Sequence, residues 1–286
     1  MRISSATSQF LCAEVLTNTG APQGCVLFPA LFTLYTSDRR CDEESALQVK
    51  FSDDTSLAGM IIGDENTYRT AVKGLVSWCN DNFLCLKVSR TKEMVIDLRR
   101  NAPALNPLVL KGEEVKFAHQ YKYSGTTLDD KLDWAENSAT LLKKANQRLF
   151  FLKILKSFKV NAELLELFYY ATTEPIVTYN SLCFYSSLKR TDTAKLSKVK
   201  RTASKLIGSV VVDLQAHFER KALQRLRAIL ADPTHPLNEE LTAQMSARIT
   251  SGRLVSLKTR TNRFFRSFLP SAIRLFNATE LGVHNR

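Results

Sequence analysis

The sequence has few of the residues that build metal centres and disulfide frameworks. Its six cysteines are scattered without a C-x-x-C pair, and its four histidines are isolated from one another. The cysteines are Cys12, Cys25, Cys41, Cys79, Cys85 and Cys183, and the histidines are His119, His217, His235 and His284. Neither set has the spacing of a zinc site, and such cysteines are typical of reduced thiols in an intracellular protein.

Long apolar runs are also missing. No run approaches the ~20 residues that a membrane-spanning helix requires. The first six residues, MRISSA, lack the sustained apolar core of a signal peptide. We therefore expect an intracellular protein, in the nucleus or the cytoplasm, that has no membrane partner and is not secreted. The 286 residues, 44% of them hydrophobic, are enough for one large globular domain or two medium ones.

Acidic residues are scarce in the second half of the chain. Residues 140–286 contain 25 of the 40 Lys and Arg residues but only 10 of the 28 Asp and Glu residues. A basic region of this kind fits a polyanionic partner, and binding through phosphates weakens steeply as salt is added. A basic helical protein without such a partner is the alternative, and charge alone does not exclude it.

Residues 51–54, Phe-Ser-Asp-Asp, are the most informative part of the sequence. The alternation of Leu47, Val49 and Phe51 before the two acids predicts a half-buried strand, and apolar residues return after them. The acids should therefore occupy a hairpin turn, where Asp is favoured. Neighbouring carboxylates repel each other unless a cation neutralises them, and Mg²⁺ binds one or two carboxylates together with substrate phosphates. Taken alone, the pair is better interpreted as a solvated turn.

Hydrophobic periodicity predicts the other elements. We expect a largely buried helix at 25–35, a helix at 64–83, two short strands within 84–98 and a β-ribbon at 107–128. The period becomes helical from residue 133, with shorter helices at about 161–173 and 191–208.

Four motifs then occur in a specific order. They are GAPQGCVLFP at 20–29, FSDD at 51–54, NFLCLKVSRTKE at 82–93, and YKYSG at 121–125 followed by LDW at 132–134. In this order they resemble the reverse transcriptase of non-long-terminal-repeat (LINE-type) retrotransposons, from about residue 14 to 277. Each motif is weak alone, whereas the ordered set is specific.

The resemblance implies a role for several residues. Asp53 would be a catalytic metal ligand and Asp54 a second carboxylate, with Mg²⁺ as the cofactor. The other implied residues are Pro22, Gln23 and Gly24 in the nucleotide and template pocket, Arg90 and Lys92 near the triphosphate, and Tyr121, Tyr123 and Gly125 in the primer grip. The implied partners are an RNA template and a DNA primer, or an RNA–DNA duplex. Surface charge is an equal interpretation of Arg90 and Lys92, and packing within a strand is one for Tyr123.

The fold that follows is α+β. Residues 1–135 would form a partial polymerase palm, an antiparallel hairpin packed on helices, together with the primer-grip ribbon. Residues 136–208 would form an all-helical basic thumb, and residues 209–286 a basic, irregular C-terminal tail.

The family places another metal-binding aspartate on a strand before the G-x-P-Q-G motif. Residues 1–15 contain no aspartate, and the segment that would form the fingers is missing. Because catalysis depends on the positions of two metal ions, we expect this truncated chain alone not to polymerise DNA. Departures from the family pattern suit a decaying genomic copy. They occur at Phe28, Ser52, Lys87, Arg90 and Ser124.

Three other interpretations stay open. The chain could be a non-enzymatic nucleic-acid binder, whose basic helices grip the backbone and whose Arg- and Phe-rich end stacks on bases. A less favoured one is a module associated with AlkB-type dioxygenases, because segments such as 140–190 resemble a module named for them. Such an oxygenase needs His-x-Asp and a distal His, and only residues 217–219, His-Phe-Glu, come close. The third is a globular α+β protein with a chance Asp-Asp turn.

Overall fold

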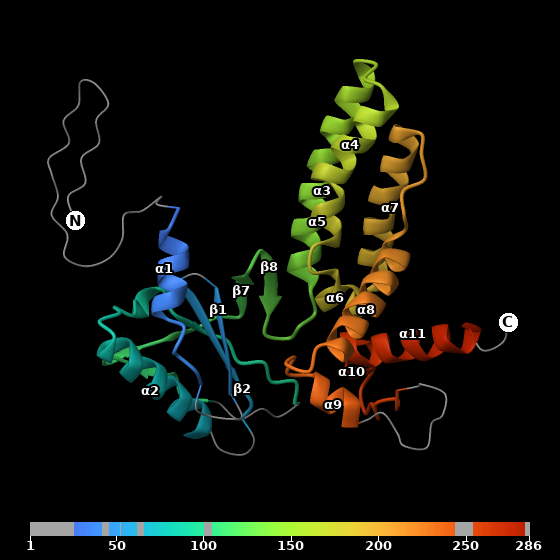
Figure 1. The fold of residues 1–286 in the computed structure, drawn as a ribbon. Coiled ribbons are helices and arrows are strands. Elements are labelled where there is room, and N and C mark those ends of the chain that lie inside the picture. The colour runs from blue at the N-terminus through green and yellow to red at the C-terminus, as the bar shows by residue number, and fades with distance from the viewer. Residues whose placement is uncertain are drawn as a thin grey trace, which may run out of the picture. The chain divides into compact units, whose positions relative to one another are not determined.

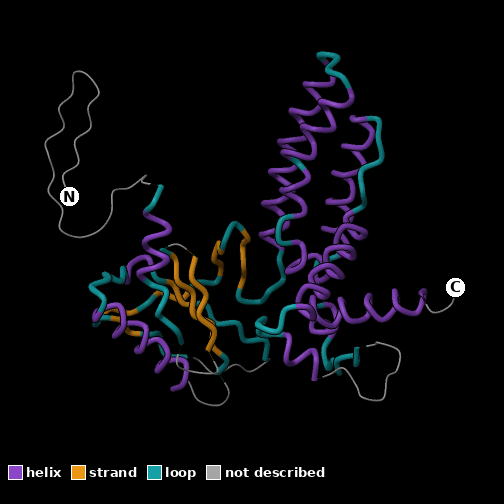
Figure 2. The backbone as a smooth tube through the Cα atoms, viewed as in Figure 1, coloured by secondary structure: helices purple, strands orange, loops and turns teal. Residues whose placement is uncertain are grey.

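The computed structural model describes residues 26–41, 46–51, 53–61, 66–99, 105–243 and 254–283. Helices and short strands are mixed, as the expected α+β class requires (Figures 1 and 2). The chain divides into an N-terminal unit, residues 1–93 and 105–116, and a helical unit, residues 94–104 and 117–286. Across the described ranges, every helix is too short or too polar to cross a membrane.

The N-terminal unit combines two helices with short hairpins. Its elements are α1 (Phe28–Tyr35), β1 (Ala46–Phe51), β2 (Asp54–Gly59), α2 (Asn66–Asp81), the 3-10 turn η1 (Val88–Arg90), β3 (Lys92–Glu93), β4 (Val109–Leu110) and β5 (Glu113–Glu114), and β6 (Lys116–Phe117) lies at its end. A small core joins α2, β2, η1 and β4. It consists of Val72, Leu108, Leu110 and Val115, with Leu57, Tyr68, Val76, Leu86 and Val88 packed around it.

Helix α1 forms as predicted, with Pro29 in its first turn, where the missing N–H has no consequence. The prediction that it is largely buried is wrong, because none of its residues is buried and Leu34 is 69% exposed. The helix is held by polar contacts instead. The Tyr35 hydroxyl donates to the Asn82 carbonyl at 2.6 Å, and the Lys50 ammonium donates to the carbonyls of Thr36 and Arg39 beyond the last turn.

Three hairpins close through two-residue turns. Strands β1 and β2 are antiparallel, from the Ala46–Gly59 pair to the Phe51–Asp54 pair. The β4–β5 turn is Lys111-Gly112, and the turn between β7 (Gln120–Tyr123) and β8 (Thr126–Asp129) is Ser124-Gly125. The four residues of the β4–β5 and β7–β8 turns have positive φ, from 44° to 83°. This is the type I′ geometry that matches strand twist. Both hairpins lie in the region where the β-ribbon was predicted.

The two strands expected within 84–98 are mostly absent from the described residues there, which form η1 and the two-residue β3. Local hydrogen bonds explain the difference. The amide of Arg90 and the side chain of Thr91 both donate to the Lys87 carbonyl at 3.1 Å, which closes a turn where a strand would need an extended backbone.

The helical unit contains β7, β8 and a series of helices (Figure 1). The helices are α3 (Ala135–Ser157), α4 (Ala162–Thr172), α5 (Glu174–Thr178), α6 (Ser181–Phe184), the 3-10 turn η2 (Tyr185–Ser187), α7 (Arg190–Ile207), α8 (Leu214–Ala231), α9 (Asn238–Ala243), α10 (Asn262–Arg266) and α11 (Phe268–Val283). The predicted helices near 161–173 and 191–208 are confirmed as α4 and α7.

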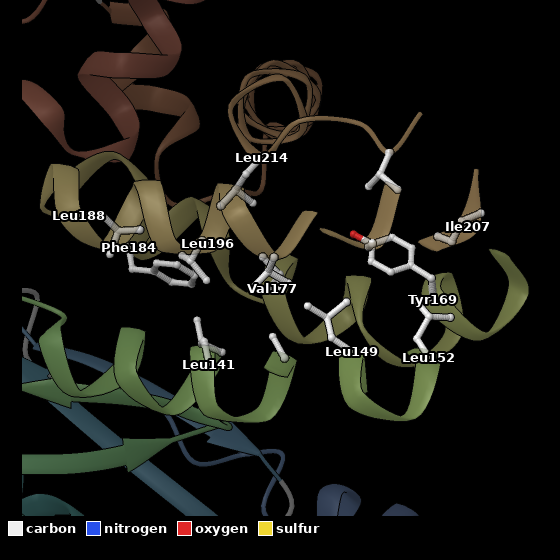
Figure 3. Packing of buried hydrophobic residues seen from close by; sticks show 14 of the residues in the cluster. Leu141, Leu149, Leu152, Tyr169, Val177, Phe184, Leu188, Leu196, Ile207 and Leu214 are labelled. Atoms are coloured by element: carbon white, nitrogen blue, oxygen red, sulfur yellow. The ribbon is translucent and has the colours of Figure 1, made fainter. Parts of the chain in front are cut away.

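The first core of this unit lies among α3, α4, α5 and α7 (Figure 3). Leu141, Leu149 and Leu152 of α3 point into it at helical spacing, which is the apolar face expected from the sequence. Local signals also fix the start of α4 and the end of α7. The Asn161 side chain accepts from the Leu164 amide at 2.9 Å, and α7 ends at Gly208 with a φ of 88°.

The prediction of an irregular tail at 209–286 is wrong for the described residues. Helices α8, α9 and α11 share a second core, whose buried residues are Phe218, Ala222, Leu226, Ile229, Leu241, Leu254, Ala272 and Ile273. The interspersed basic residues hid this apolar spacing. Asp213 caps α8 by accepting from the Gln215 amide at 3.1 Å, and Pro270 stands within the first turn of α11, where it is tolerated.

Candidate functional site

The two adjacent acids lie at the tip of the β1–β2 hairpin. Asp53 belongs to the turn, and Asp54 is the first residue of β2, opposite Phe51. Both side chains are exposed, and neither has a hydrogen-bond or ion-pair partner in the described part of the chain. The turn geometry expected from the sequence is therefore present, and it leaves the four carboxylate oxygens free for a ligand.

The base of this hairpin is fixed by packing. Leu57 of β2 lies against the core of the N-terminal unit. Gly59 allows α2 to approach closely, because a Cβ at this position would stand 3.0 Å from the Tyr68 ring. A tip with free acids on an anchored base can hold a cation without a large rearrangement.

Carboxylate oxygens are the donors that Mg²⁺ prefers, and this ion usually keeps several waters and binds one or two carboxylates. The carboxylates of Asp53 and Asp54 are ligands of the chemical type that this ion prefers. Within the described ranges, no three His, Cys, Asp or Glu side chains form a group that could hold a metal. From the described residues, an ion at this tip would therefore take only the carboxylates of Asp53 and Asp54.

The basic residues Arg90 and Lys92 lie in the same unit. Arg90 ends η1 and Lys92 begins β3, and both side chains are exposed. Val88, in η1, packs against the core that also holds Leu57. One small core thus supports both the acidic tip and these two cations, although no ion pair joins the two groups in the described residues. Pro22, Gln23 and Gly24 lie outside the described residues.

The expected primer-grip residues form the β7–β8 hairpin, which belongs to the helical unit. Tyr121 is 42% exposed, Tyr123 is half-buried, and Gly125 lies in the turn with a φ of 83°. The prediction that this ribbon belongs with the palm at residues 1–135 is therefore wrong, because its contacts join it to the helices that follow.

Two residues that the sequence did not single out hold this turn. The Tyr179 hydroxyl donates to the Ser124 carbonyl at 2.6 Å, and the Asn180 amide donates to the Thr126 hydroxyl at 2.8 Å. Both lie at the junction of α5 and α6. The ring of Tyr179 also lies 3.4 Å from the position that a Cβ on Gly125 would take. No local pattern marks Tyr179, because its partner is 55 residues away.

The LDW motif at 132–134 provides a second anchor for the hairpin. The carboxylate of Asp129, the last residue of β8, accepts from the backbone amides of Lys131, Asp133 and Trp134 at 3.0 to 3.1 Å. Trp134 is 6% exposed and leads directly into α3. The motif is thus a structural clamp that joins the ribbon to the first long helix.

The outer face of α3 combines cationic, amide and aromatic side chains. Lys143, Asn146, Gln147, Phe150 and Phe151 line an open hollow of about 700 Å³. Their spacing places them opposite the buried leucines of the same helix. Phe150 is 59% exposed and Phe151 is 46% exposed, so apolar rings are displayed beside a positive charge.

A buried charged network lies in the same unit. Lys200 Nζ is 2.9 Å from both Glu174 Oε1 and the Val212 carbonyl, and the Tyr169 hydroxyl donates to Glu174 Oε2 at 2.5 Å. His217 Nδ1 is 3.9 Å from Glu174 Oε1. Burial and Glu174 raise the pKa of Tyr169, whereas burial and then Lys200 lower the pKa of His217. His217, the residue nearest to an iron-ligand pattern, thus lies beside the Lys200–Glu174 ion pair.

Comparison with known proteins gives two partial matches. The family described as Alkylated DNA repair protein alkB homolog 8, N-terminal, matches residues 134–175, which cover α3, α4 and the start of α5. This segment contains no His and no Asp, so it does not itself include a His-x-Asp iron motif.

The second match is to the Probable RNA-directed DNA polymerase from transposon BS of Drosophila melanogaster. The two chains are 28% identical over an alignment 154 residues long, which covers 49% of this chain and 17% of that protein. The chain thus spans less than a fifth of the length of this relative. No solved structure matches. The similarity supports a relationship to reverse transcriptases in general terms.

Proposed function

We propose that this chain is part of the reverse transcriptase of a LINE-type retrotransposon, with a palm hairpin and a thumb of basic helices. The observation that carries the proposal is the exposed Asp53–Asp54 pair at the tip of an anchored two-residue hairpin. The partial similarity to a transposon RNA-directed DNA polymerase supports it independently of the structure.

In this proposal the N-terminal unit provides the nucleotide site. Asp53 and Asp54 would hold Mg²⁺, which supplies electrostatic stabilisation for phosphoryl transfer when it is bound. Arg90 and Lys92 would attract the triphosphate, since both are exposed cations on the same core as the hairpin. Pro22, Gln23 and Gly24 would line the pocket for the base and the template.

The helical unit would hold the template and primer. Tyr121, Tyr123 and the turn at Gly125 would contact the primer end. The outer face of α3 would lie against an RNA–DNA duplex, with Lys143 near a phosphate and with the amides of Asn146 and Gln147 facing the groove. Duplexes of this kind are recognised by backbone and shape, so the contacts would be to phosphates and to the groove and would not read a base sequence.

By themselves, residues 1–286 are expected not to synthesise DNA. The family draws one catalytic aspartate from a strand upstream of the G-x-P-Q-G loop, and residues 1–15 contain none. A metal site held by carboxylates of one hairpin alone positions two ions poorly.

Two assays separate the parts of this proposal. Fluorescence anisotropy with a labelled RNA–DNA duplex should show binding that weakens steeply between 50 and 200 mM salt. Primer extension on an RNA template with Mg²⁺ should give no product. Absence of duplex binding would contradict the whole proposal. Robust Mg²⁺-dependent synthesis would contradict only the inactivity of the isolated chain.

A non-enzymatic nucleic-acid binder is the second candidate, and the aromatic and basic face of α3 favours it. For such a protein the acidic tip has no role. Asp53→Ala should then leave binding unchanged with and without Mg²⁺, whereas Lys143→Gln with Phe150→Ala should weaken it. The matched control is Lys198→Gln, an exposed lysine on α7. An AlkB-type oxygenase would require iron-dependent activity that is lost in His217→Ala.

A further inference from the structure

The helical unit contains an open pocket that the proposed palm and thumb roles do not use. Its volume is about 430 Å³, which lies within the range of small-molecule sites, ~300–1,000 Å³. The walls come from η2, α7, α8, α10 and α11, so the pocket lies on residues that the sequence assigned to an irregular tail and on the helices before them. None of its lining residues belongs to the β7–β8 hairpin or to α3.

Two arginines give the pocket a positive side. Arg266 is the last residue of α10, and Arg274 lies on α11. The Arg274 guanidinium stacks 3.7 Å from the centre of the Phe265 ring and donates to the Ser271 hydroxyl at 3.1 Å. These contacts fix the orientation of the guanidinium. Its planar, permanently charged fork suits a phosphate better than a lysine would.

An aromatic wall lies in the same pocket. Tyr185 and Phe218 both line it, and their ring centroids are 5.1 Å apart. Phe218 is buried and supports Tyr185, which is half-buried and faces the pocket. Burial, Asp213 and Glu219 raise the pKa of Tyr185 to about 12, so its hydroxyl stays protonated as a donor. A supported aromatic ring offers a surface on which an unpaired base can stack.

Polar groups complete the lining. The Ser186 hydroxyl is buried and has no hydrogen-bond partner in the described part of the chain. Leaving such a group unpaired is unfavourable by about 1–3 kcal/mol, and a ligand that bonds to it removes that penalty. Glu219 accepts from the Gln215 side chain at 2.9 Å and retains a second carboxylate oxygen that could accept from a base amino group.

We propose that this pocket binds one unpaired nucleotide of an RNA or DNA strand. The phosphate lies at Arg266 and Arg274, the base stacks on Tyr185, and Glu219 accepts from its edge. A simple anion would be repelled by Glu219 and would make no use of the aromatic ring. A base inside a duplex cannot enter, because its edge is already paired. The inference takes only the class of partner, nucleic acid, from the proposed function.

The first test measures the affinity of the full chain for a fluorescein-labelled single-stranded octanucleotide, as RNA and as DNA. Arg266→Gln should weaken binding about tenfold, the factor that corresponds to the loss of one charged hydrogen bond. The matched control is Arg201→Gln, an exposed arginine on α7 that carries the same change of charge. Equal weakening in both variants would overturn the proposal that the pocket binds a nucleotide, because it would show only a general effect of charge. Circular dichroism melting checks that each variant folds.

The second test locates the base. An octanucleotide that contains 5-iodouridine is irradiated with the chain, and the cross-linked peptide is identified by mass spectrometry. Cross-links to the peptide that contains Tyr185, lost on competition with a nucleoside monophosphate but not with inorganic phosphate, support the pocket. Cross-links elsewhere, or equal competition by phosphate, overturn it. Binding of free nucleotides without any binding of the octanucleotide would also overturn it.

A parallel measurement with an RNA–DNA duplex separates this inference from the proposed function. If the chain binds single strands in an Arg266-dependent way but does not bind the duplex, the proposed function is contradicted and the pocket proposal stands. If the chain binds the duplex independently of Arg266 but binds no single strand, the pocket proposal is contradicted and the proposed function stands.

Discussion

The hydroxyl of Tyr179 donates a hydrogen bond to the carbonyl oxygen of Ser124 at 2.6 Å. This contact joins the end of α5 to the turn of the β7–β8 hairpin, which carries the expected primer-grip residues. Together with Asn180 on Thr126 and Asp129 on the start of α3, it attaches the hairpin to the helices at both ends. The hairpin and the helices after it should therefore move as one body.

Tyr179→Phe removes only the hydroxyl and keeps the ring beside Gly125. Because the freed Ser124 carbonyl is exposed and can bond to water, we expect a modest loss of about 0.5–1.5 kcal/mol in the free energy of unfolding. Amide hydrogen exchange at residues 124–126 should accelerate at the same time. The control is Tyr170→Phe on α4, whose ring is 41% exposed. Unchanged exchange at 124–126 in Tyr179→Phe would show that the bond does not hold the turn.

Two glycines of the N-terminal unit should respond to alanine with opposite signs. A Cβ on Gly59 would stand 3.0 Å from the Tyr68 ring, so Gly59→Ala forces the hairpin or α2 to shift and lowers stability. Gly74 lies within α2, and its new Cβ would meet only the end of the Arg39 side chain at 3.7 Å. Gly74→Ala should raise stability by up to about 1 kcal/mol, since Gly is a poor helix former. Urea unfolding compares them, and equal signs would contradict this packing.

The hairpins could be predicted from the sequence because their signals are local. Lys111-Gly112 and Ser124-Gly125 occupy type I′ turns, and Gly at the second position is the residue that this geometry favours. The turn at the two acids was predicted for the same reason, from an Asp pair between two apolar runs. The prediction that the strand before it is half-buried through Leu47, Val49 and Phe51 is wrong, because these side chains are 58%, 41% and 73% exposed. Whether the site residues act as the resemblance implies stays a prediction.

Long-range contacts could not be predicted in this way. Nothing near Tyr179 indicates Ser124, and nothing near Lys200 indicates Glu174, 26 residues before it. The prediction of a buried α1 failed because apolar composition was taken as burial, while Lys50 and Asn82 hold that helix through polar contacts. The helices of residues 209–286 were not predicted, because arginines interrupt the apolar spacing of α8 in the sequence. Phe218 and Leu226 nevertheless lie on the buried face of this helix.

Lys200→Met tests the buried ion pair. Lys200 is 2% exposed, and its loss leaves the partly buried Glu174 carboxylate without its cation. We expect destabilisation of about 3–5 kcal/mol, and a partial recovery when Glu174→Gln is added. The control is Lys198→Met, an exposed position on the same helix, which should change stability by less than about 0.5 kcal/mol. Guanidinium unfolding measures all three. A double variant less stable than Lys200→Met would contradict the pairing.

Asp53→Asn tests the acidic tip as a cation site. Both acids of the tip are exposed, so the substitution should change stability by less than about 0.5 kcal/mol. It should nevertheless weaken the binding of Mn²⁺, a paramagnetic substitute for Mg²⁺, as seen from the broadening of amide resonances around residue 54. Asp38→Asn, at a single exposed acid, is the control. Equal broadening in the wild-type chain and in Asp53→Asn would remove the basis for a metal at this hairpin.

The stability of the helical unit should fall in mild acid because of His217. Burial and then Lys200 lower its pKa below the ordinary value of 6.5; Glu174 opposes them less strongly, and Arg220 and Lys221 add smaller lowering effects. The unfolded chain therefore binds a proton at His217 at a higher pH than the folded chain does. Stability from this group is complete above pH 6.5 and is lost progressively as the pH falls from there toward the lowered pKa.

His217→Gln should remove this part of the pH dependence. The side chain stays polar and cannot gain a proton, so the midpoint of thermal unfolding should change less between pH 7.5 and pH 5.5 than in the wild-type chain. His235→Gln is the matched control, since His235 is hydrogen-bonded near the surface after α8 and shares no contact with Lys200 or Glu174. An identical loss of stability in the wild-type chain and in His217→Gln would mean that other groups cause the acid sensitivity. In that case the network would stabilise the helices without responding to pH in this range.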